Sequence, residues 1–467
     1  MDKYDFDLIT IGGGSGGVRA SRVAAELGAR VAVIERAQLG GTCVNVGCIP
    51  KKILSFAAHY GEDLEEAARF GWTTGPRNFD WQTLLANKDA EITRLNGVYR
   101  RVLEQAGVTI IEGQARVVDG HTVDVAGRRL TAAHILVATG GRPAMPDFPG
   151  AEFAFDSDAM FHLPSLPASM VVHGAGYIAV EFASILNGLG VETILVYRGE
   201  RLLKGFDADL GTLLADEMRE KGVRLLPSTT VTRLSKSAGG ELTVELSNGE
   251  HLATGGFLAA LGRVPNVAGL GLQEAGVVLS PSGAVVVNDE YRTSVPSIFA
   301  IGDVINRIQL TPVALAEGMF VANHLFGGTS HTVPYGTVAT AVFSQPNIGT
   351  VGLSEESALQ VVPSVTVYKT TFRSLRNVIA ARQEKTFMKV LVDTETDRVI
   401  GMHMLGPEAG EIIQGFAAAI TAGITKRQLD ATIGIHPTLA EEFVTLRKAS
   451  AVLTGIAARS AVTTSAK

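Results

Sequence analysis

Two cysteines, five positions apart, are the residues of this sequence whose types and spacing point most directly to chemistry. Cys43 and Cys48 are the only cysteines of the chain, and both lie in the segment GGTCVNVGCIPKK, residues 40–52. Two sulfurs are too few for a zinc site, which needs four ligands, so we expect no bound metal. A C-x4-C pair can close a disulfide across one helical turn and work as a reversible dithiol. The pair predicts electron transfer through sulfur, and two unreactive thiols are the alternative.

A glycine-rich turn follows the first apolar run of the chain. Gly12, Gly14 and Gly17 satisfy the pattern G-x-G-x-x-G within the sequence GGGSGG. Such a turn lets main-chain N–H groups and a helix N-terminus approach a pyrophosphate. Glu35 lies 18 residues after Gly17, where a carboxylate accepts hydrogen bonds from ribose hydroxyls. The turn predicts a site for a dinucleotide with an unphosphorylated ribose, and a plain glycine-rich turn is the alternative.

A second turn, GAGYIA at residues 174–179, has the related pattern G-x-G-x-x-A. Counting the same 18 residues from its end reaches Tyr197, so the acid is absent, and three cations follow it: Arg198, Arg201 and Lys204. A 2′-phosphate on the ribose would repel a carboxylate and attract cations. This turn therefore predicts NADP(H) rather than NAD(H), with a solvated basic helix start as the alternative.

Short apolar strands and helices must position these turns and the cysteine pair. Hydrophobic periodicity predicts a strand–helix–strand unit twice, at residues 6–11, 15–27 and 30–34, and at 170–173, 177–189 and 192–197. Between the units we expect mostly helix over 63–105, strands with turns over 108–125 and a buried strand over 133–138. Past Pro265 we expect short strands ending at 298–301, then a helix over 312–325.

A different pattern of secondary structure is expected from residue 337 onward. There we expect strands around Val351, at 365–368 and at 388–392, helices at 411–422 and 439–449, and a frayed tail over 454–467. The fold class predicted from these elements is α/β, with two Rossmann-like dinucleotide-binding domains followed by an α+β C-terminal domain.

Composition and charge exclude several classes of function. The 467 residues carry a net charge of −6 and no basic block, so we expect neither nucleic-acid nor anionic-membrane binding. No stretch of about 20 uncharged apolar residues predicts a membrane span. The N-terminus, MDKYDFD, lacks the basic segment and long apolar core of a signal peptide, so the expected location is cytoplasmic.

Along almost its whole length the sequence resembles the flavin disulfide reductases, and within them the glutathione reductases. The matching motifs, in chain order, are GGTCVNVGCIPKK (40–52), ATG (138–140), GAGYIAVE (174–181), LGRVPN (261–266), AIGD (300–303) and HPTLAEEF (436–443). The resemblance implies FAD in the first nucleotide site and NADPH in the second. It also implies domains for FAD, NADPH, the central part of the FAD site and dimerisation at residues 1–142, 143–264, 265–336 and 337–467.

The resemblance also implies roles for individual residues. Cys48 would be the flavin-facing sulfur that forms the charge-transfer thiolate, and Cys43 the exchange thiol that attacks the substrate disulfide. Lys51 would pair with Glu181 near flavin N5. Tyr177 would cover the flavin until nicotinamide displaces it.

An acid/base pair is implied at the C-terminal motif. Glu441 would orient His436 and stabilise its charged form. In the family this motif reaches the active site of the other subunit, which implies an obligate homodimer with shared active sites.

Further binding residues are implied position by position. For FAD they are Gly12, Gly14, Ser15, Gly16, Gly17, Glu35, Thr42, Lys51, Ala115, Thr139, Gly140, Asp303 and Thr311. For NADPH they are Gly174, Ala175, Gly176, Ile178, Glu181, Arg198, Lys204, Gly262, Arg263, Gln309 and Val342. For glutathione they are Ser15, Arg22 and Tyr99, while Met319 replaces a further contacting Arg.

The resemblance thus predicts NADPH-dependent reduction of glutathione disulfide. Trypanothione reductases have an acid and a Trp where this chain has Arg19 and Arg22, and these two cations favour the carboxylates of glutathione. Lipoamide dehydrogenases would have an acid at Tyr197. A reductase for a related disulfide, such as glutathione amide, a glutathione conjugate or a trypanothione-like substrate, is the alternative, as is a flavin redox sensor without turnover.

Overall fold

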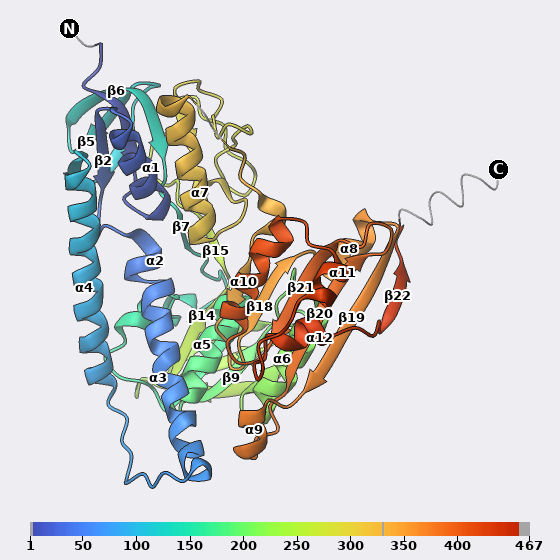
Figure 1. Ribbon diagram of the computed structural model, residues 1–467. Helices are drawn as coiled ribbons and strands as arrows, with labels where there is room; N and C mark the ends of the chain where they lie inside the picture. The colour runs from blue at the N-terminus through green and yellow to red at the C-terminus, as the bar shows by residue number, and fades with distance from the viewer. Residues whose placement is uncertain (1–2, 329–330, 457–467) are drawn as a thin grey trace, which may run out of the picture.

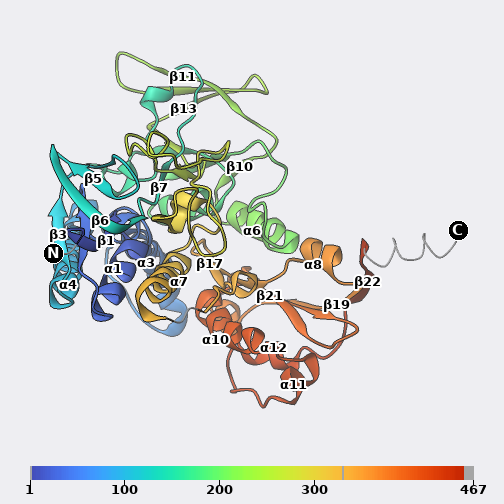
Figure 2. The same cartoon turned by 90° about the horizontal axis from the view of Figure 1, so that it is seen from above.

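The computed structural model describes residues 3–328 and 331–456 of the chain. Figure 1 shows three parts: an N-terminal part with the long helix α4 (Trp81–Gln105) along its side, a central part around β9 (Glu192–Val196) and β14 (Gly256–Ala259), and a C-terminal part built on the strands from β18 to β22, residues 348–454. In the view from above, the C-terminal part with α10, α11 and α12 lies to one side of the other two (Figure 2). The two nucleotide turns belong to the first two parts.

The N-terminal part is built on a seven-stranded sheet of order β3-β2-β1-β6-β5-β4, with β16 also paired to β6. Its strands are β1 (Phe6–Ile11), β2 (Val31–Glu35), β3 (Thr109–Glu112), β4 (Ala115–Val117), β5 (Thr122–Val125), β6 (Arg128–Val137) and β16 (Ile298–Ala300). The pairs among β1, β2, β3, β6 and β16 are parallel, and β4 and β5 continue as antiparallel strands. Parallel strands are covered on both faces, which explains the continuous apolar sequence of β1 and β2. Helices α1 (Ser15–Glu26) and α7 (Thr311–Ala322) pack together beside this sheet.

The cysteine segment forms two helices rather than a loop. Cys43 lies in α2 (Gly41–Asn45), and Cys48 is the first residue of α3 (Cys48–Glu66). We expected helix only from residue 63, and the earlier start is explained by Pro50, which is tolerated in a first helical turn. After η1 (Ala67–Phe70) the chain has no regular structure until α4 (Trp81–Gln105).

The central part repeats the parallel arrangement on a smaller scale. Its four parallel strands have the order β10-β9-β8-β14. They are β8 (Ser169–His173), β9 (Glu192–Val196), β10 (Arg224–Leu226) and β14 (Gly256–Ala259), with helices α5 (Tyr177–Gly188) and α6 (Ala208–Glu220). An antiparallel sheet of β11 (Val231–Lys236), β12 (Leu242–Leu246) and β13 (His251–Thr254) packs beside them. The chain enters this part through β7 (Gly141–Pro143) and leaves through β15 (Arg263–Pro265), which pair with each other.

The C-terminal part is an antiparallel sheet of order β17-β18-β21-β20-β19-β22 with helices packed against it. Its strands are β17 (Thr340–Val342), β18 (Ile348–Gly352), β19 (Ser364–Phe372), β20 (Thr386–Asp393), β21 (Val399–Leu405) and β22 (Ala451–Thr454). Its helices are α8 (Glu355–Val361), α9 (Leu375–Ile379), α10 (Ala409–Thr421), α11 (Lys426–Ala431) and α12 (Glu441–Thr445). The remaining short helical turns are η2 (Ala151–Phe153), η3 (Ala159–His162), η4 (Gly302–Ile305), η5 (Asn323–Gly327) and η6 (Tyr335–Thr337).

Three expectations about elements were wrong. The helix expected over 439–449 is only five residues long, because the main chain at Ser450 bonds to Val367 O and continues as β22. Thr454, the last residue of β22, pairs with Ser364 of β19 and is not frayed. Residues 457–467 of the expected tail lie outside the described residues. Between β15 and β16 the described chain has no strand, only isolated bridges such as Leu279 to Val285.

Two clusters of charged side chains join the three parts. In the Lys389 cluster, Lys389 Nζ lies 2.9 Å from Asp207, 3.0 Å from Asp209 and 2.8 Å from Glu355, so β20 and α8 are tied to the start of α6. The Lys389 and Asp207 side chains are 2% and 0% exposed.

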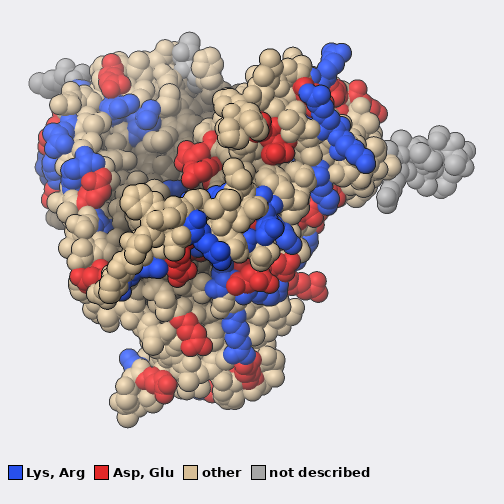
Figure 3. Space-filling model, turned by 60° about the horizontal axis from the view of Figure 1, so that its bottom comes forward, with Lys and Arg blue, Asp and Glu red and all other residues tan. Residues whose placement is uncertain are grey.

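The second, the Glu62 cluster, reaches all three parts. Lys221, just after α6, lies 2.6 Å from Glu62 of α3 and 2.9 Å from Glu384 of the C-terminal part. Arg382 also pairs with Glu62, at 2.8 Å, and with Glu66. On the face shown in Figure 3, acidic and basic side chains are interspersed. No helix within residues 3–328 and 331–456 is long and apolar enough to cross a membrane.

Candidate functional site

The two cysteines are free thiols that lie against each other at the junction of α2 and α3. A hydrogen bond from the Cys43 thiol lowers the pKa of Cys48 to about 6, and the Thr311 hydroxyl and the Lys51 ammonium act in the same direction. The same hydrogen bond, together with burial, raises the pKa of Cys43. Cys48 opens a helix of 19 residues, where the N-terminal dipole also favours a thiolate. The site therefore holds its negative charge on Cys48.

Asparagine side chains hold the cysteine segment in place. Asn45 Nδ2 donates to Gly41 O at 2.9 Å, closing the turn around Cys43. Asn96, on α4, donates to Asn45 Oδ1 at 2.9 Å and to Leu39 O at 2.8 Å. Sequence reasoning missed both asparagines, because nothing in the local pattern shows that α4 lies beside the cysteine segment.

A buried ion pair lies next to Cys48. Lys51 Nζ is 2.7 Å from Glu181 Oε1, and the two side chains are 12% and 4% exposed. They are 130 residues apart and come from α3 and α5, so the fold brings together the pair that the resemblance implied. The main-chain N–H of Phe343 donates to the same Glu181 oxygen at 2.8 Å. Phe343 is a residue that sequence reasoning missed, although it directly follows Val342.

The first glycine turn connects β1 to α1 closely enough to exclude side chains. A Cβ at Gly17 would lie only 1.9 Å from Gly12 O. Glu35, at the end of β2, accepts hydrogen bonds from Gly13 N–H at 2.7 Å and Ala37 N–H at 2.8 Å. The carboxylate is therefore fixed beside the turn, where the sequence placed a ribose.

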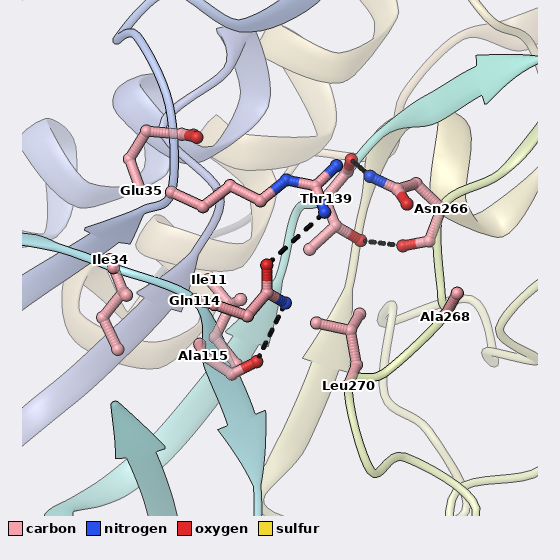
Figure 4. A pocket seen from close by; sticks show the side chains of 12 residues that line it. Ile11, Ile34, Glu35, Gln114, Ala115, Thr139, Asn266, Ala268 and Leu270 are labelled. Atoms are coloured by element: carbon pink, nitrogen blue, oxygen red, sulfur yellow. Dashed lines mark hydrogen bonds between the residues drawn. The ribbon is translucent and has the colours of Figure 1, made fainter. Parts of the chain in front are cut away.

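A pocket lies at the carboxyl ends of the parallel strands. It is lined by four of the predicted FAD residues, Gly12, Glu35, Ala115 and Thr139, as well as Asn266 (Figure 4). Thr139 and Asn266 are joined by two hydrogen bonds, of 2.8 and 3.3 Å. The motif LGRVPN therefore contributes its last residue, Asn266, to this first pocket, although Gly262 and Arg263 of the same motif are predicted to bind NADPH.

The residues present fit a dinucleotide with hydroxyl groups. Burial raises the pKa of Asp303, and within the described chain its carboxyl group has no hydrogen-bond partner. Thr311, the first residue of α7, lies 3.8 Å from Cys48 Sγ through its hydroxyl. The site thus combines the Asp303 carboxyl group, which has no hydrogen-bond donor within the described chain, with a glycine turn at a helix N-terminus and the two cysteines. These groups suit a cofactor such as FAD.

The second glycine turn is equally tight on one side and open on the other. A Cβ at Gly174 would lie 2.2 Å from Ala260 O, whereas one at Gly176 would meet no atom within 4 Å. Arg198 and Lys204 are exposed, and neither has an ion-pair partner in the part of the chain that the structure describes. Arg201, between them, is paired with Glu356 at 3.1 Å. The segment between β9 and α6 therefore carries two cations that have no ion-pair partner within the described residues.

The other residues predicted for NADPH lie in different surroundings. The Arg263 guanidinium donates to Gly141 O at 2.7 Å and Thr42 Oγ1 at 3.2 Å, and lies 3.3 Å from Asp158. It thereby links the β7–β15 connection to the cysteine segment. The Gln309 side chain donates a hydrogen bond to Asn306, and Gly262 has a positive φ. Val342 is buried, whereas Ala175 and Ile178 are half-buried. Tyr177, at the start of α5, is 37% exposed.

Of the residues predicted for glutathione, Tyr99 is the one for which the structure shows an interaction with the cysteines within the described residues. Ser15 and Arg22 lie on α1, and burial together with the neighbouring Cys43 raises the pKa of Tyr99 on α4. Arg19 Nη1, also on α1, lies 3.5 Å from the sulfur of Met319 on α7.

The C-terminal pair is formed but lies apart from the cysteines. His436 Nδ1 lies 2.9 and 3.2 Å from the two Glu441 oxygens, and the histidine side chain is 81% exposed. Within the described residues, His436 contacts neither cysteine of its own chain. Figures 1 and 2 place α12 on the C-terminal part, away from α3.

Comparison with known proteins gives one consistent result. Residues 6–318 match the family described as pyridine nucleotide-disulphide oxidoreductase, and residues 338–447 match its dimerisation domain. A glutathione reductase of Burkholderia cepacia is 47% identical over 447 residues, which cover 96% of this chain and 99% of that protein. The chloroplastic/mitochondrial glutathione reductase of Pisum sativum is 46% identical, with 95% of this chain and 83% of the relative covered. A glutathione reductase of Nostoc sp. is 44% identical, with 95% and 100% covered.

Proposed function

Because this chain belongs to the pyridine nucleotide-disulphide oxidoreductase family, we propose that it reduces glutathione disulfide with NADPH by means of FAD and the Cys43–Cys48 pair. The observation that carries the proposal is a thiol pair with a lowered pKa at Cys48, placed between two glycine turns at helix N-termini. An enzyme is favoured over a redox sensor without turnover because the chain has every predicted catalytic thiol and charged group: Cys43, Cys48, Lys51, Glu181, His436 and Glu441.

Each nucleotide has its own set of residues. Bound FAD supplies the transfer of an electron pair from NADPH to sulfur. Glu35, Asp303 and Thr311 hold FAD together with the first glycine turn, while Arg198 and Lys204 bind the 2′-phosphate of NADPH. The lack of competing partners for Asp303, Arg198 and Lys204 within the described chain supports these assignments.

The two thiols divide the reduction of the substrate between them. The Cys43 sulfur attacks one sulfur of glutathione disulfide and gives up its proton, so that a mixed disulfide forms and the first glutathione leaves as a thiol. Cys48 thiolate then attacks the Cys43 sulfur, which restores the Cys43–Cys48 disulfide and releases the second glutathione. Cys48 suits the second step because its lowered pKa keeps it ionised at neutral pH.

We assign the protonation of the first departing glutathione to His436 of a second copy of the chain. Three features support a homodimer with shared active sites: the matched dimerisation domain, the exposed imidazole held by Glu441, and the separation of His436 from its own cysteines. Ile433 and Ile435, 93% and 77% exposed beside the histidine, are typical of a surface that another chain covers.

The division of the chain into domains follows the same proposal. The parts for FAD, NADPH, the central part of the FAD site and dimerisation span residues 1–142, 143–264, 265–336 and 337–467. The β7–β15 pair, where the chain crosses between parts, supports the first two boundaries. A cytoplasmic location agrees with a sequence that has only two cysteines, because proteins of a reducing compartment are not normally held together by structural disulfides.

Steady-state kinetics tests the function. Purified protein loaded with FAD should oxidise NADPH only when a disulfide substrate is present. The rate should be higher with glutathione disulfide than with glutathione amide disulfide or trypanothione disulfide. A preference for either of the other disulfides would move the assignment to a related reductase. No oxidation with any disulfide would instead favour a redox sensor.

A further inference from the structure

The ring of Phe343 is in contact with two consecutive lysines. Phe343 follows β17 and is half-buried. Lys51 Nζ lies 4.1 Å from the centroid of its ring, and Lys52 Nζ lies 3.9 Å from it. Consecutive residues of a helix point in different directions, so two ammonium groups reach one ring only because the ring lies where both side chains converge.

Phe343 also contacts the partner of Lys51. Its main-chain N–H donates to Glu181 Oε1 at 2.8 Å, the same oxygen that lies 2.7 Å from Lys51 Nζ. One residue of the C-terminal part thus touches both members of an ion pair formed by α3 and α5. An ammonium group over an aromatic face is attracted by the ring quadrupole, most strongly where water is excluded.

We infer that Phe343 is a positioning residue whose ring and main-chain N–H together fix the Lys51–Glu181 pair beside Cys48. The inference rests on the proposed function, because it assigns Phe343 a part in keeping the thiol pair reactive. Lys51 favours the thiolate of Cys48 and Glu181 opposes it, so the position of the two charges decides their net effect on the sulfur. Without the ring, Lys51 is free to turn toward solvent while Glu181 stays on its main-chain donor.

Other charged groups near these residues define the background of any titration. The groups that act on Cys48, or respond to it, are Cys43, Thr311, Lys51, Glu181, Tyr99 and Tyr177. The groups that face Lys52 are Lys51, Glu181, Glu408 and Glu411. Phe343→Leu removes none of these charges, so a shift in titration reports a change of position.

The test is a pH titration of the two-electron-reduced holoenzyme. The long-wavelength absorbance that a thiolate gives beside bound flavin reports the ionised fraction of Cys48, and it needs no glutathione. In Phe343→Leu we expect its midpoint to rise by at least about half a pH unit, a roughly threefold loss of thiolate below the midpoint. Phe343→Tyr keeps the aromatic face and should titrate like the wild type.

Phe56→Leu is the matched control. Lys52 Nζ also lies 5.0 Å from the Phe56 ring, which Lys51 does not contact, so this variant should not move the midpoint. If leucine at position 343 prevents folding, Phe343→Met supplies a flexible side chain of similar size without an aromatic face. The inference would be overturned if the Phe343→Leu or Phe343→Met holoenzyme had the same midpoint as the wild type. It would also be overturned if Phe56→Leu shifted the midpoint as much as Phe343→Leu. The titration involves no substrate, so its result stands whether or not the protein reduces glutathione disulfide.

Discussion

Selectivity for NADPH should depend on Arg198 far more than on its neighbour Arg201. Both residues are exposed and belong to the same turn after β9, but only Arg201 is already paired, with Glu356 at 3.1 Å. A charge-assisted hydrogen bond is worth about 1.5 to 3 kcal/mol, which corresponds to a roughly 10- to 100-fold change in affinity. Because Arg198 is exposed and screened by salt, we expect the lower half of that range for Arg198→Ala.

The assay is steady-state kinetics with both nicotinamides at fixed glutathione disulfide. In Arg198→Ala, KM for NADPH should rise about 10- to 30-fold with little change in kcat, because the 2′-phosphate takes no part in the chemistry. KM for NADH should stay within about twofold, since NADH lacks that phosphate. Arg201→Ala removes the same charge from the same turn and should change neither constant strongly. Equal losses with NADPH and NADH, or an equal effect of Arg201→Ala, would refute the assignment of the phosphate site.

Further expected outcomes concern the thiols, the second subunit and the Lys389 cluster. Cys43→Ser should abolish disulfide reduction but keep FAD and its reduction by NADPH, whereas Cys48→Ser should also lose the thiolate absorbance; loss of FAD from both variants would mean a structural role. Mixed dimers of Cys43→Ser and His436→Ala chains should recover about half the wild-type activity per dimer, since one site carries both defects and the other neither; mixed dimers as inactive as both parents would contradict the shared site. Lys389→Met should lower the free energy of unfolding by about 3 kcal/mol or more in chemical denaturation, because it removes the ammonium group that lies against the buried Asp207 carboxylate, and adding Asp207→Asn should restore part of the loss.

The sequence was most informative where chemistry and secondary structure occur together. The two glycine turns, each between a strand and a helix, predicted the parallel sheets and the placement of Glu35 at a strand end, and the structure has both. The motif resemblance predicted the Lys51–Glu181 pair across 130 residues. No local pattern predicts such a contact, because it depends on how α3 and α5 pack.

Three features could not be read from local patterns because they depend on tertiary contacts. The apolar spacing after residue 439 suited a long helix, but pairing of the chain with β19 ends α12 at Thr445. Asn96 looked like an ordinary helix residue until α4 was seen beside the cysteine segment. Phe343 belongs to no motif and to no element predicted from the sequence, and only the fold shows that two lysines lie over its ring.

The Lys389 and Glu62 clusters have a consequence for how the molecule moves. A rotation of the central part against the C-terminal part would have to break the ion pairs of Lys389 with Asp207 and Asp209 and the hydrogen bond from Glu355 N–H to Asp207. The Glu62 cluster holds α3 against both of the other parts. With the three parts tied together in this way, we expect access between the two nucleotide sites to be gated by a side chain rather than by a hinge, and Tyr177, at the start of α5 and 37% exposed, is the residue predicted to act as that gate. Side-chain rotations take picoseconds to nanoseconds whereas domain motions take microseconds to milliseconds, so a gate of this kind would not limit the rate of turnover.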